Sequence, residues 1–176
     1  SQDYLFEKLK LLLALADFKK DLADFGKGKT MVIDYSAPNI AKSFGIGHLR
    51  STNIGQSIYN LYQILGYKTI GDNHLGDWGT QFGIVLLGWK EEGNEERLKE
   101  KPIQYLLELY IKYNRLAEED EGWRQRAREW FRRLEEGDEQ AKNLWQRFRD
   151  LSLEEFKRVY KRLGVEFDYY LSLIHI

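Results

Sequence analysis

The spacing of apolar residues separates a first stretch that mixes helix and strand from a longer stretch that is helical. Near the start, a helically spaced set predicts one amphipathic helix that breaks down near residues 26–28: Leu5, Leu9, Leu12, Leu13 and Ala16. The β-branched run at 30–33 predicts a buried strand that feeds a turn. A helical lead-in therefore precedes the first strand.

A second helix and a second strand follow that turn. Apolar residues recur at helical spacing from Ile54 to Leu65, and Gly66 is suited to end the helix. Residues 67–70 predict a strand, and residues 71–79, rich in Gly and Asp, predict an irregular loop. Because strand, glycine-containing loop, helix and strand form a βαβ unit, we expect parallel strands with a right-handed crossover.

The remaining residues predict helices only. Pro102 suits the first turn of one helix, a second spans 123–134, and Asp138 suits the N-cap of a third. Ser152 and Glu155 have the spacing of a capping box, which predicts that a fourth helix begins there and ends at Gly164. The fold class expected is α/β, with a parallel sheet unit followed by helices.

Composition narrows the classes of function. A hydrophobic share of 43% and an aromatic share of 14% suffice for a packed core, and 27 basic against 28 acidic residues give a net charge of −1 that offers a polyanion no general attraction. Without Cys there is no disulfide or thiolate chemistry, and three His leave little material for a metal site. The apolar run at 11–16 is far shorter than the roughly 20 residues that span a bilayer. We expect no membrane span, no metal bound by protein ligands and a cytoplasmic location.

A basic run in the helical stretch has two interpretations. Arginines at 124, 126, 128, 132 and 133 alternate with glutamates, so a salt-bridged helix face is favoured over an RNA-binding stripe.

The candidate chemistry lies where the first strand meets the following helix, because ligands of parallel sheets bind at the carboxyl ends of strands. Gly45 and Gly47 leave the backbone bare for a nucleotide, and the start of the helix favours a phosphate. His48 adds a ring donor and Lys42 a cation. Taken alone the pattern is weak, since two glycines before a helix also serve tight packing.

A longer pattern carries a specific resemblance. Residues 34–55, DYSAPNIAKSFGIGHLRSTNIG, and residues 73–83, NHLGDWGTQFG, resemble the arginyl-tRNA synthetases closely, and the likeness extends over about residues 25 to 170. Other class I synthetases share only the G-x-G-H element.

The resemblance implies an incomplete Rossmann-like sheet unit of the class I synthetase (HUP) type with a helical insertion. It divides the chain into a helical lead-in (1–29), the first half of the nucleotide-binding catalytic domain (30–92) and the insertion (93–170). The ending, residues 171–176, departs from the family and is expected to be a non-native tail that packs poorly.

The resemblance also implies a reaction, ATP-dependent activation of arginine to arginyl-adenylate and transfer to tRNA(Arg). The arginine site would comprise Asp34, Ala37, Pro38, Asn39 and His48; the ATP site, with Mg²⁺ arriving on the nucleotide, would comprise Lys42, Gly45, Gly47 and His48. His48 and Lys42 would be the catalytic pair, and a pocket wall would be formed by Asp77, Trp78 and Gln81. Asp34 as a simple turn cap and Lys42 as a surface lysine are the alternatives, and His74 is expected to be structural.

Three departures from the family pattern weaken the expected site. Gly45 replaces the first His of the element, Ser43 stands in place of Pro, and Ala37 replaces a Ser.

The second half of the nucleotide fold and the anticodon-binding domain are not among these residues, so the chain alone is expected to be inactive. We expect a monomer that meets tRNA mainly through those other domains. A catalytically inactive synthetase-like binding module is the alternative, and a different nucleotidyl-transferring enzyme of the same superfamily is a second.

Overall fold

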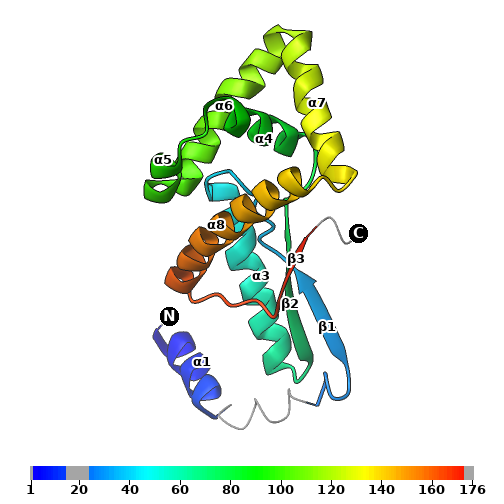
Figure 1. Cartoon of the computed structure of the whole chain (residues 1–176). Coiled ribbons are helices and arrows are strands. Elements are labelled where there is room, and N and C mark those ends of the chain that lie inside the picture. Colours follow the sequence, from blue (N-terminus) through cyan, green and yellow to red (C-terminus); the bar gives the residue numbers. More distant parts are fainter. Residues whose placement is uncertain (1, 15–23, 173–176) are drawn as a thin grey trace.

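A computed structural model describes residues 2–14 and 24–172 (Figure 1). It contains a three-stranded parallel sheet in the order β1-β2-β3, formed by β1 (Thr30–Asp34), β2 (Lys68–Leu75) and β3 (Tyr169–Ser172). Helix α3 (Ile46–Ile64) connects β1 to β2, so the predicted parallel βαβ unit is confirmed. Helix α1 (Gln2–Ala14) precedes the sheet and confirms the predicted first helix, except that Ala16 lies outside the described residues.

The helical part follows β2 and lies above the sheet in Figure 1. It consists of α4 (Thr80–Glu92), α5 (Glu95–Glu100), α6 (Pro102–Glu119), α7 (Glu121–Glu135) and α8 (Glu139–Leu163). Within this part, helix α8 crosses between the other helices and the strands, and the chain then enters β3. The sheet unit thus includes a strand from the far end of the sequence. None of the helices in the described residues is long and apolar enough to cross a membrane.

Two glycines allow α4 to pack closely against its neighbours. A methyl group at Gly83 would lie 2.0 Å from the carbonyl oxygen of Ala127 in α7, and one at Gly88 would lie 2.8 Å from the Tyr113 ring in α6. The core that results is continuous from this helix bundle to the loop after β1, with Phe82, Leu86 and Ile40 almost fully buried.

Strand β1 is less buried than predicted. The run at 30–33 forms a strand as expected, but exposed and half-buried residues alternate along it, and Val32 is 58% exposed. Its Met31 and Ile33 are half-buried, whereas the opposite face is open in the described part of the chain. The prediction of a buried strand is wrong, because only one face of β1 is covered by other elements in the described residues.

Two further predictions are wrong in local structure. Residues 71–75 continue β2 instead of forming an irregular loop, because they pair with β1 on one side and with β3 on the other. Ser152 does not begin a helix, because α8 runs through it without a break. Its hydroxyl donates to the Phe148 carbonyl within the helix and accepts the N–H of Ala41 in the loop after β1.

The other helix boundaries agree with the sequence patterns. Asp138 caps α8 by accepting from the Ala141 N–H at 2.9 Å, and Gly164 ends it in the left-handed region at φ 66°. In the predicted tail, Leu171 and Ser172 belong to β3, and Ser172 is 2% exposed. The expectation of poor packing is therefore wrong for Ser172, whereas the Leu171 side chain is exposed although its backbone pairs with β2. Residues 173–176 lie outside the described part.

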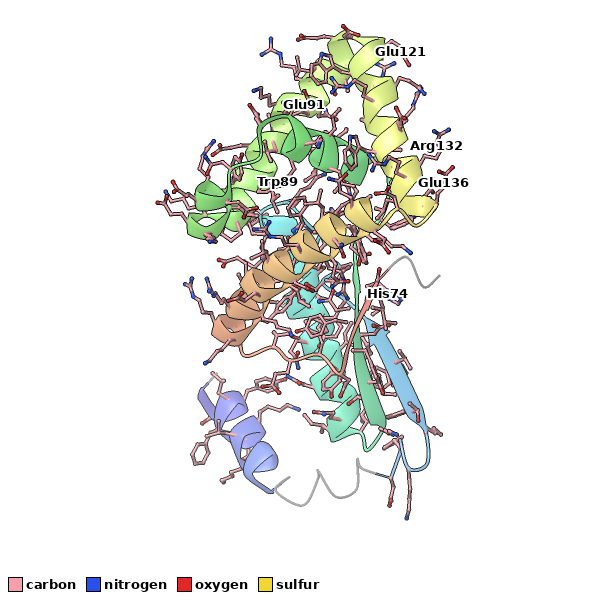
Figure 2. The ribbon with its side chains drawn as sticks, in the orientation of Figure 1. His74, Trp89, Glu91, Glu121, Arg132 and Glu136 are labelled. Atoms are coloured by element: carbon pink, nitrogen blue, oxygen red, sulfur yellow. The ribbon has the colours of Figure 1, made fainter. Side chains whose placement is uncertain are left out.

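The basic run on α7 forms ion pairs, as predicted. Arg124 and Arg128 pair with Glu121, Arg126 with Glu91, Arg132 with Glu136 and Arg133 with Asp138. Figure 2 labels Glu121, Arg132 and Glu136 along α7 and Glu91 on α4. The salt-bridged face is confirmed, because each of these guanidinium groups has a carboxylate partner.

Candidate functional site

The predicted site residues follow β1 and lead into α3. Asp34 is the last residue of β1, the loop then carries residues 35–45, and Gly47 and His48 lie in the first turn of α3. The loop returns to the end of β2 through an isolated bridge between Asn39 and Gly76, in which the Gly76 N–H donates to the Pro38 carbonyl at 3.0 Å. The carboxyl ends of two parallel strands and the start of a helix therefore meet here.

The loop has an unusual backbone. Ser36, Ala37 and Ala41 have φ values of 76°, 46° and 58°, in the left-handed region that residues other than glycine seldom adopt. Each such residue costs about 1–3 kcal/mol unless its surroundings hold it. The loop must therefore be stabilised by its contacts with other elements.

Asn39 lies against the backbone of Gly76. A methyl group at Gly76 would come within 2.3 Å of the Asn39 Oδ1, and the Ile40 N–H donates to the Gly76 carbonyl at 3.1 Å. A larger residue at position 76 would therefore displace the Asn39 side chain.

Gly45 and Gly47 leave open space at the start of α3. A methyl group added at either position would meet no atom within 4 Å. Both are exposed, and Gly45 is the N-cap with an extended backbone, φ −96° and ψ 178°. The alternative that these glycines serve tight packing is therefore wrong within the described residues, and the backbone remains accessible. The first N–H groups of the helix have no intrahelical partner and carry partial positive charge.

His48 is oriented by the residue that precedes the helix. Its Nδ1 accepts the Gly45 N–H at 3.1 Å, and its ring lies 5.5 Å from that of Phe44. Because Nδ1 is an acceptor, the proton of the neutral imidazole is on Nε2. His48 thus has one hydrogen-bond donor left for a ligand.

Lys42 lies close to the helical part. Its Nζ is 4.7 Å from the centre of the Tyr110 ring of α6, and the side chain is half-buried. Lys42 is therefore not a fully solvated surface lysine, since it makes a cation–π contact. Its predicted contact with phosphate stays a prediction.

Asp34 belongs to a group of titratable residues at the strand ends. The His74 Nδ1 lies 3.2 Å from the Asp34 carboxylate and 3.3 Å from that of Asp72, which is the register partner of Asp34. Figure 2 labels His74 beside the ends of these strands. Asp34 is half exposed whereas the Asp72 side chain is 10% exposed, so Asp34 is the more accessible carboxylate. The His74 imidazole thus lies between the two carboxylates, and its structural role stays a prediction.

Asp77 and Trp78 contact the helical part. The Asp77 carboxylate is fully buried and accepts from the Arg149 Nε at 3.2 Å, while its carbonyl accepts the Trp145 Nε1–H at 2.6 Å. Trp78 packs edge-on against Phe131 and Trp145. These contacts join the loop after β2 to α7 and α8. Gln81, in the first turn of α4, is half-buried, and the role of all three as a pocket wall stays a prediction.

A cleft of about 720 Å³ lies elsewhere, between α3 and the end of α8. Its walls include Gln56, Tyr59, Lys157 and Asp168, and none of the predicted site residues. The residues predicted from the sequence therefore do not line this cleft.

Four buried polar residues behind the loop were not predicted. Ser36, Thr52, Asn73 and Tyr160 form one hydrogen-bonded group that connects β2, α3 and α8 to the loop. Burial raises the pKa of the Tyr160 hydroxyl, so this residue keeps its proton. Sequence spacing identifies Tyr160 only as an apolar position of a helix, because its partners are distant in the chain.

Residues 2–14 and 24–172 contain no group of three or more His, Asp or Glu side chains that could hold a metal ion.

Comparison with known proteins gives a consistent result. The family model for tRNA synthetases class I (R), catalytic domain, matches residues 10–170. Arginine–tRNA ligases of Streptococcus pneumoniae strains Hungary19A-6 and CGSP14 are each 53% identical over 163 residues, which is 92% of this chain and 29% of the relative. The crystal structure of arginyl-tRNA synthetase from Plasmodium falciparum superposes with a TM-score of 0.64 at 32% identity, covering 81% of this chain and 24% of that one. The chain thus spans less than a third of the length of these curated relatives.

Proposed function

Because this chain belongs to the class I tRNA synthetases for arginine, as part of their catalytic domain, we propose that it supplies the first half of an ATP and arginine site. The whole activity would be that of an arginine–tRNA ligase. The arginine carboxylate attacks the α-phosphate of ATP and releases pyrophosphate, and the arginyl group then passes to the terminal ribose of tRNA(Arg). The relatives are much longer than this chain, so residues outside it would complete the site.

ATP is proposed to lie against residues 45–48. The unpaired N–H groups at the start of α3 and the helix dipole favour its phosphates, and the absence of side chains at Gly45 and Gly47 lets the nucleotide approach the backbone. The Nε2–H of His48 would donate to the phosphate as charge builds up on it during attack. Mg²⁺ would arrive on the phosphates, and Lys42 would supply a further cation after moving from Tyr110.

Arginine is proposed to bind at the adjacent turn. Ala37, Pro38 and Asn39 would hold its amino-acid group, and the accessible carboxylate of Asp34 would pair with a positive charge of the substrate. Asp77, Trp78 and Gln81 would support the pocket wall from behind, through the contacts of the first two with the helical part. In this arrangement residues 30–92 provide the site and residues 93–170 brace it. A cytoplasmic, monomeric protein that meets tRNA through other domains remains part of the proposal.

One observation carries the proposal. At the start of α3, Gly45 and Gly47 leave the backbone exposed although no neighbouring atom requires glycine there. The neighbouring His48 imidazole is held in the tautomer that donates from Nε2. A packing motif requires neither feature, whereas a phosphate site uses both.

The test is a titration of the ¹⁵N-labelled chain with MgATP, followed by NMR. The amide signals of Gly47 and His48 should shift, and AMP, which lacks the charged tail, should bind more weakly. His48→Ala should weaken ATP binding about tenfold, since hydrogen bonds to charged groups contribute about 1.5 kcal/mol or more. The matched control is Gln63→Ala at the other end of α3, which should leave affinity unchanged.

Shifts confined to the cleft around Tyr59, or equal affinity of His48→Ala and the unchanged chain, would contradict the proposed site. Exchange between ATP and pyrophosphate in the presence of arginine and tRNA should be near zero for these 176 residues alone. Robust exchange would mean that the site is complete without further residues.

A further inference from the structure

Behind the proposed arginine turn lies a chain of buried hydrogen bonds that starts on β2 and ends on α3. The Asn73 Nδ2 lies 3.0 Å from the Tyr160 hydroxyl, which lies 2.8 Å from the Ser36 Oγ. The Ser36 Oγ lies 2.8 Å from the Thr52 Oγ1, and Thr52 lies 2.7 Å from the His48 carbonyl oxygen. Of these residues, Tyr160 alone belongs to the helical part.

The donors at the two ends of this chain are fixed. The Asn73 Oδ1 accepts the Ala37 N–H at 3.1 Å, so its Nδ2 faces Tyr160 and donates to it. At the other end the Thr52 hydroxyl is placed to donate to the Ser36 Oγ and to the His48 carbonyl oxygen. Between Ser36 and Tyr160 either hydroxyl could be the donor. The Tyr160 hydroxyl therefore joins the amide of Asn73 on β2 to the Ser36 side chain of the turn.

The position of Tyr160 makes it the link between the two ends of this chain. It is 1% exposed and is surrounded by the rings of Phe44, Phe167 and Tyr170. Both of its hydroxyl partners, Ser36 and Asn73, contact the turn or belong to it. The turn itself has left-handed backbone at Ser36 and Ala37, which its surroundings must hold.

We propose that Tyr160 is a positioning residue for the arginine-binding turn: its hydroxyl fixes the Ser36 side chain and the Asn73 amide, and these hold the backbone of Ser36 and Ala37 in the conformation that binds substrate. The proposal rests on the proposed function only where it takes the turn to be a substrate site, because the hydrogen bonds that hold the turn exist without a ligand. The helical part thereby contributes to the site without touching the substrate.

The test uses Tyr160→Phe, which keeps the ring and removes the hydroxyl. Amide hydrogen exchange is measured by NMR on the 176-residue chain. Exchange of the Ala37 N–H, which is shared between the Tyr35 carbonyl and Asn73 Oδ1, should become about tenfold faster or more. Exchange of the Ala41 N–H should accelerate much less than that of Ala37, because the Ala41 N–H is held independently by the Ser152 hydroxyl.

The matched control is Tyr170→Phe, whose ring lies 6.4 Å from that of Tyr160. It should leave Ala37 exchange unchanged. Ser36→Ala should accelerate Ala37 exchange as Tyr160→Phe does, and the double variant should add little, because both changes break the same chain. Faster exchange in equal measure at Ala37, Ala41 and core amides would mean a general loss of stability and would overturn the positioning role.

Arginine titration separates this proposal from the proposed function. If the unchanged chain binds arginine, Tyr160→Phe should weaken binding about tenfold and Tyr170→Phe should not; equal affinities would overturn the link to substrate. If the unchanged chain does not bind arginine, the proposed substrate site fails for this chain, and the exchange data alone decide whether Tyr160 positions the turn.

Discussion

The hydroxyl of Ser152, in the middle of α8, accepts the backbone N–H of Ala41 at 3.2 Å. The two residues are 111 positions apart in the sequence, and both are buried. Ala41 has φ 58°, so a single side-chain hydrogen bond holds a left-handed residue of the candidate site against the helical part.

This relationship predicts the effect of Ser152→Ala. The Ala41 N–H would be buried without its partner, and the free energy of unfolding should fall by about 1–3 kcal/mol in urea titrations. The control is Ser57→Ala in α3, where the hydroxyl donates to the Asn53 carbonyl on an exposed surface. Since Ser57 makes no such tertiary contact, its replacement should change stability by less than about 0.5 kcal/mol. Equal losses for the two variants would contradict the importance of the Ala41 contact.

Two glycines of α3 should respond oppositely to alanine. A methyl group at Gly55 would lie 2.2 Å from Cγ of Tyr35, so Gly55→Ala should destabilise the fold by about 2 kcal/mol or more. Gly47→Ala meets open space and should leave stability unchanged or raise it by up to about 1 kcal/mol. Thermal unfolding gives both values.

The same Gly47→Ala variant should bind MgATP more weakly, because the methyl group occupies the surface that the nucleotide would approach. Calorimetry or NMR titration measures this. Unchanged ATP affinity in a well-folded Gly47→Ala chain would argue against close approach of the nucleotide to this backbone.

The ion pair between Asp77 and Arg149 should matter more than those on the surface. Asp77 is fully buried and Arg149 is 18% exposed, so Arg149→Met removes a charged partner from a buried carboxylate and should cost about 3 kcal/mol. Arg126→Met is the control, because Arg126 also stacks on a tryptophan but its pair with Glu91 is exposed. That variant should cost less than about 1 kcal/mol. Urea unfolding of both variants would show whether the costs differ in this order.

Stability should fall at alkaline pH. Burial, followed by the nearby Tyr160 and Glu166, raises the pKa of Tyr170 from 10.0 to about 12. Below pH 10 the hydroxyl is protonated in both states; between about 10 and 12 it loses its proton mainly in the unfolded chain. The folded chain then binds more protons, and the free energy of unfolding decreases as pH rises.

Urea unfolding at several pH values between about 9 and 11.5 measures this slope. Tyr170→Phe should make the decrease of stability with pH shallower, whereas Tyr169→Phe, at an exposed neighbouring position, should leave it unchanged. Burial also raises the pKa of Tyr35 and Tyr160, so part of the slope should persist in Tyr170→Phe.

The elements with strong local signals were predictable from the sequence. Helix ends at Asp138 and Gly164 and the βαβ order follow from spacing and capping chemistry alone. The alternation of arginines and glutamates predicted a salt-bridged face on α7, but not that Arg126 pairs with Glu91 of α4. The glycine loop and His48 could be proposed as site residues because their chemistry is local. The family assignment followed from two motifs in fixed order, and the comparisons confirm it.

Features that depend on distant contacts were not predictable. Ser152 has the spacing of a cap, but the Ala41 N–H uses its hydroxyl and the helix continues. Asn73 and Asp72 are typical of loops, yet pairing with β1 and β3 keeps them in a strand. Tyr160 could not be distinguished from a core residue, since the partners of its hydroxyl lie 87 and 124 positions away.

Strand β1 has a further physical consequence. Its outer side has no neighbouring strand in the described residues, so N–H and C=O groups there are free to pair with another extended chain, next to the exposed Val32. Such an edge is a template for intermolecular strand addition. Aggregation of the isolated chain should therefore increase steeply with its concentration, and a charged residue at position 32 should reduce this aggregation.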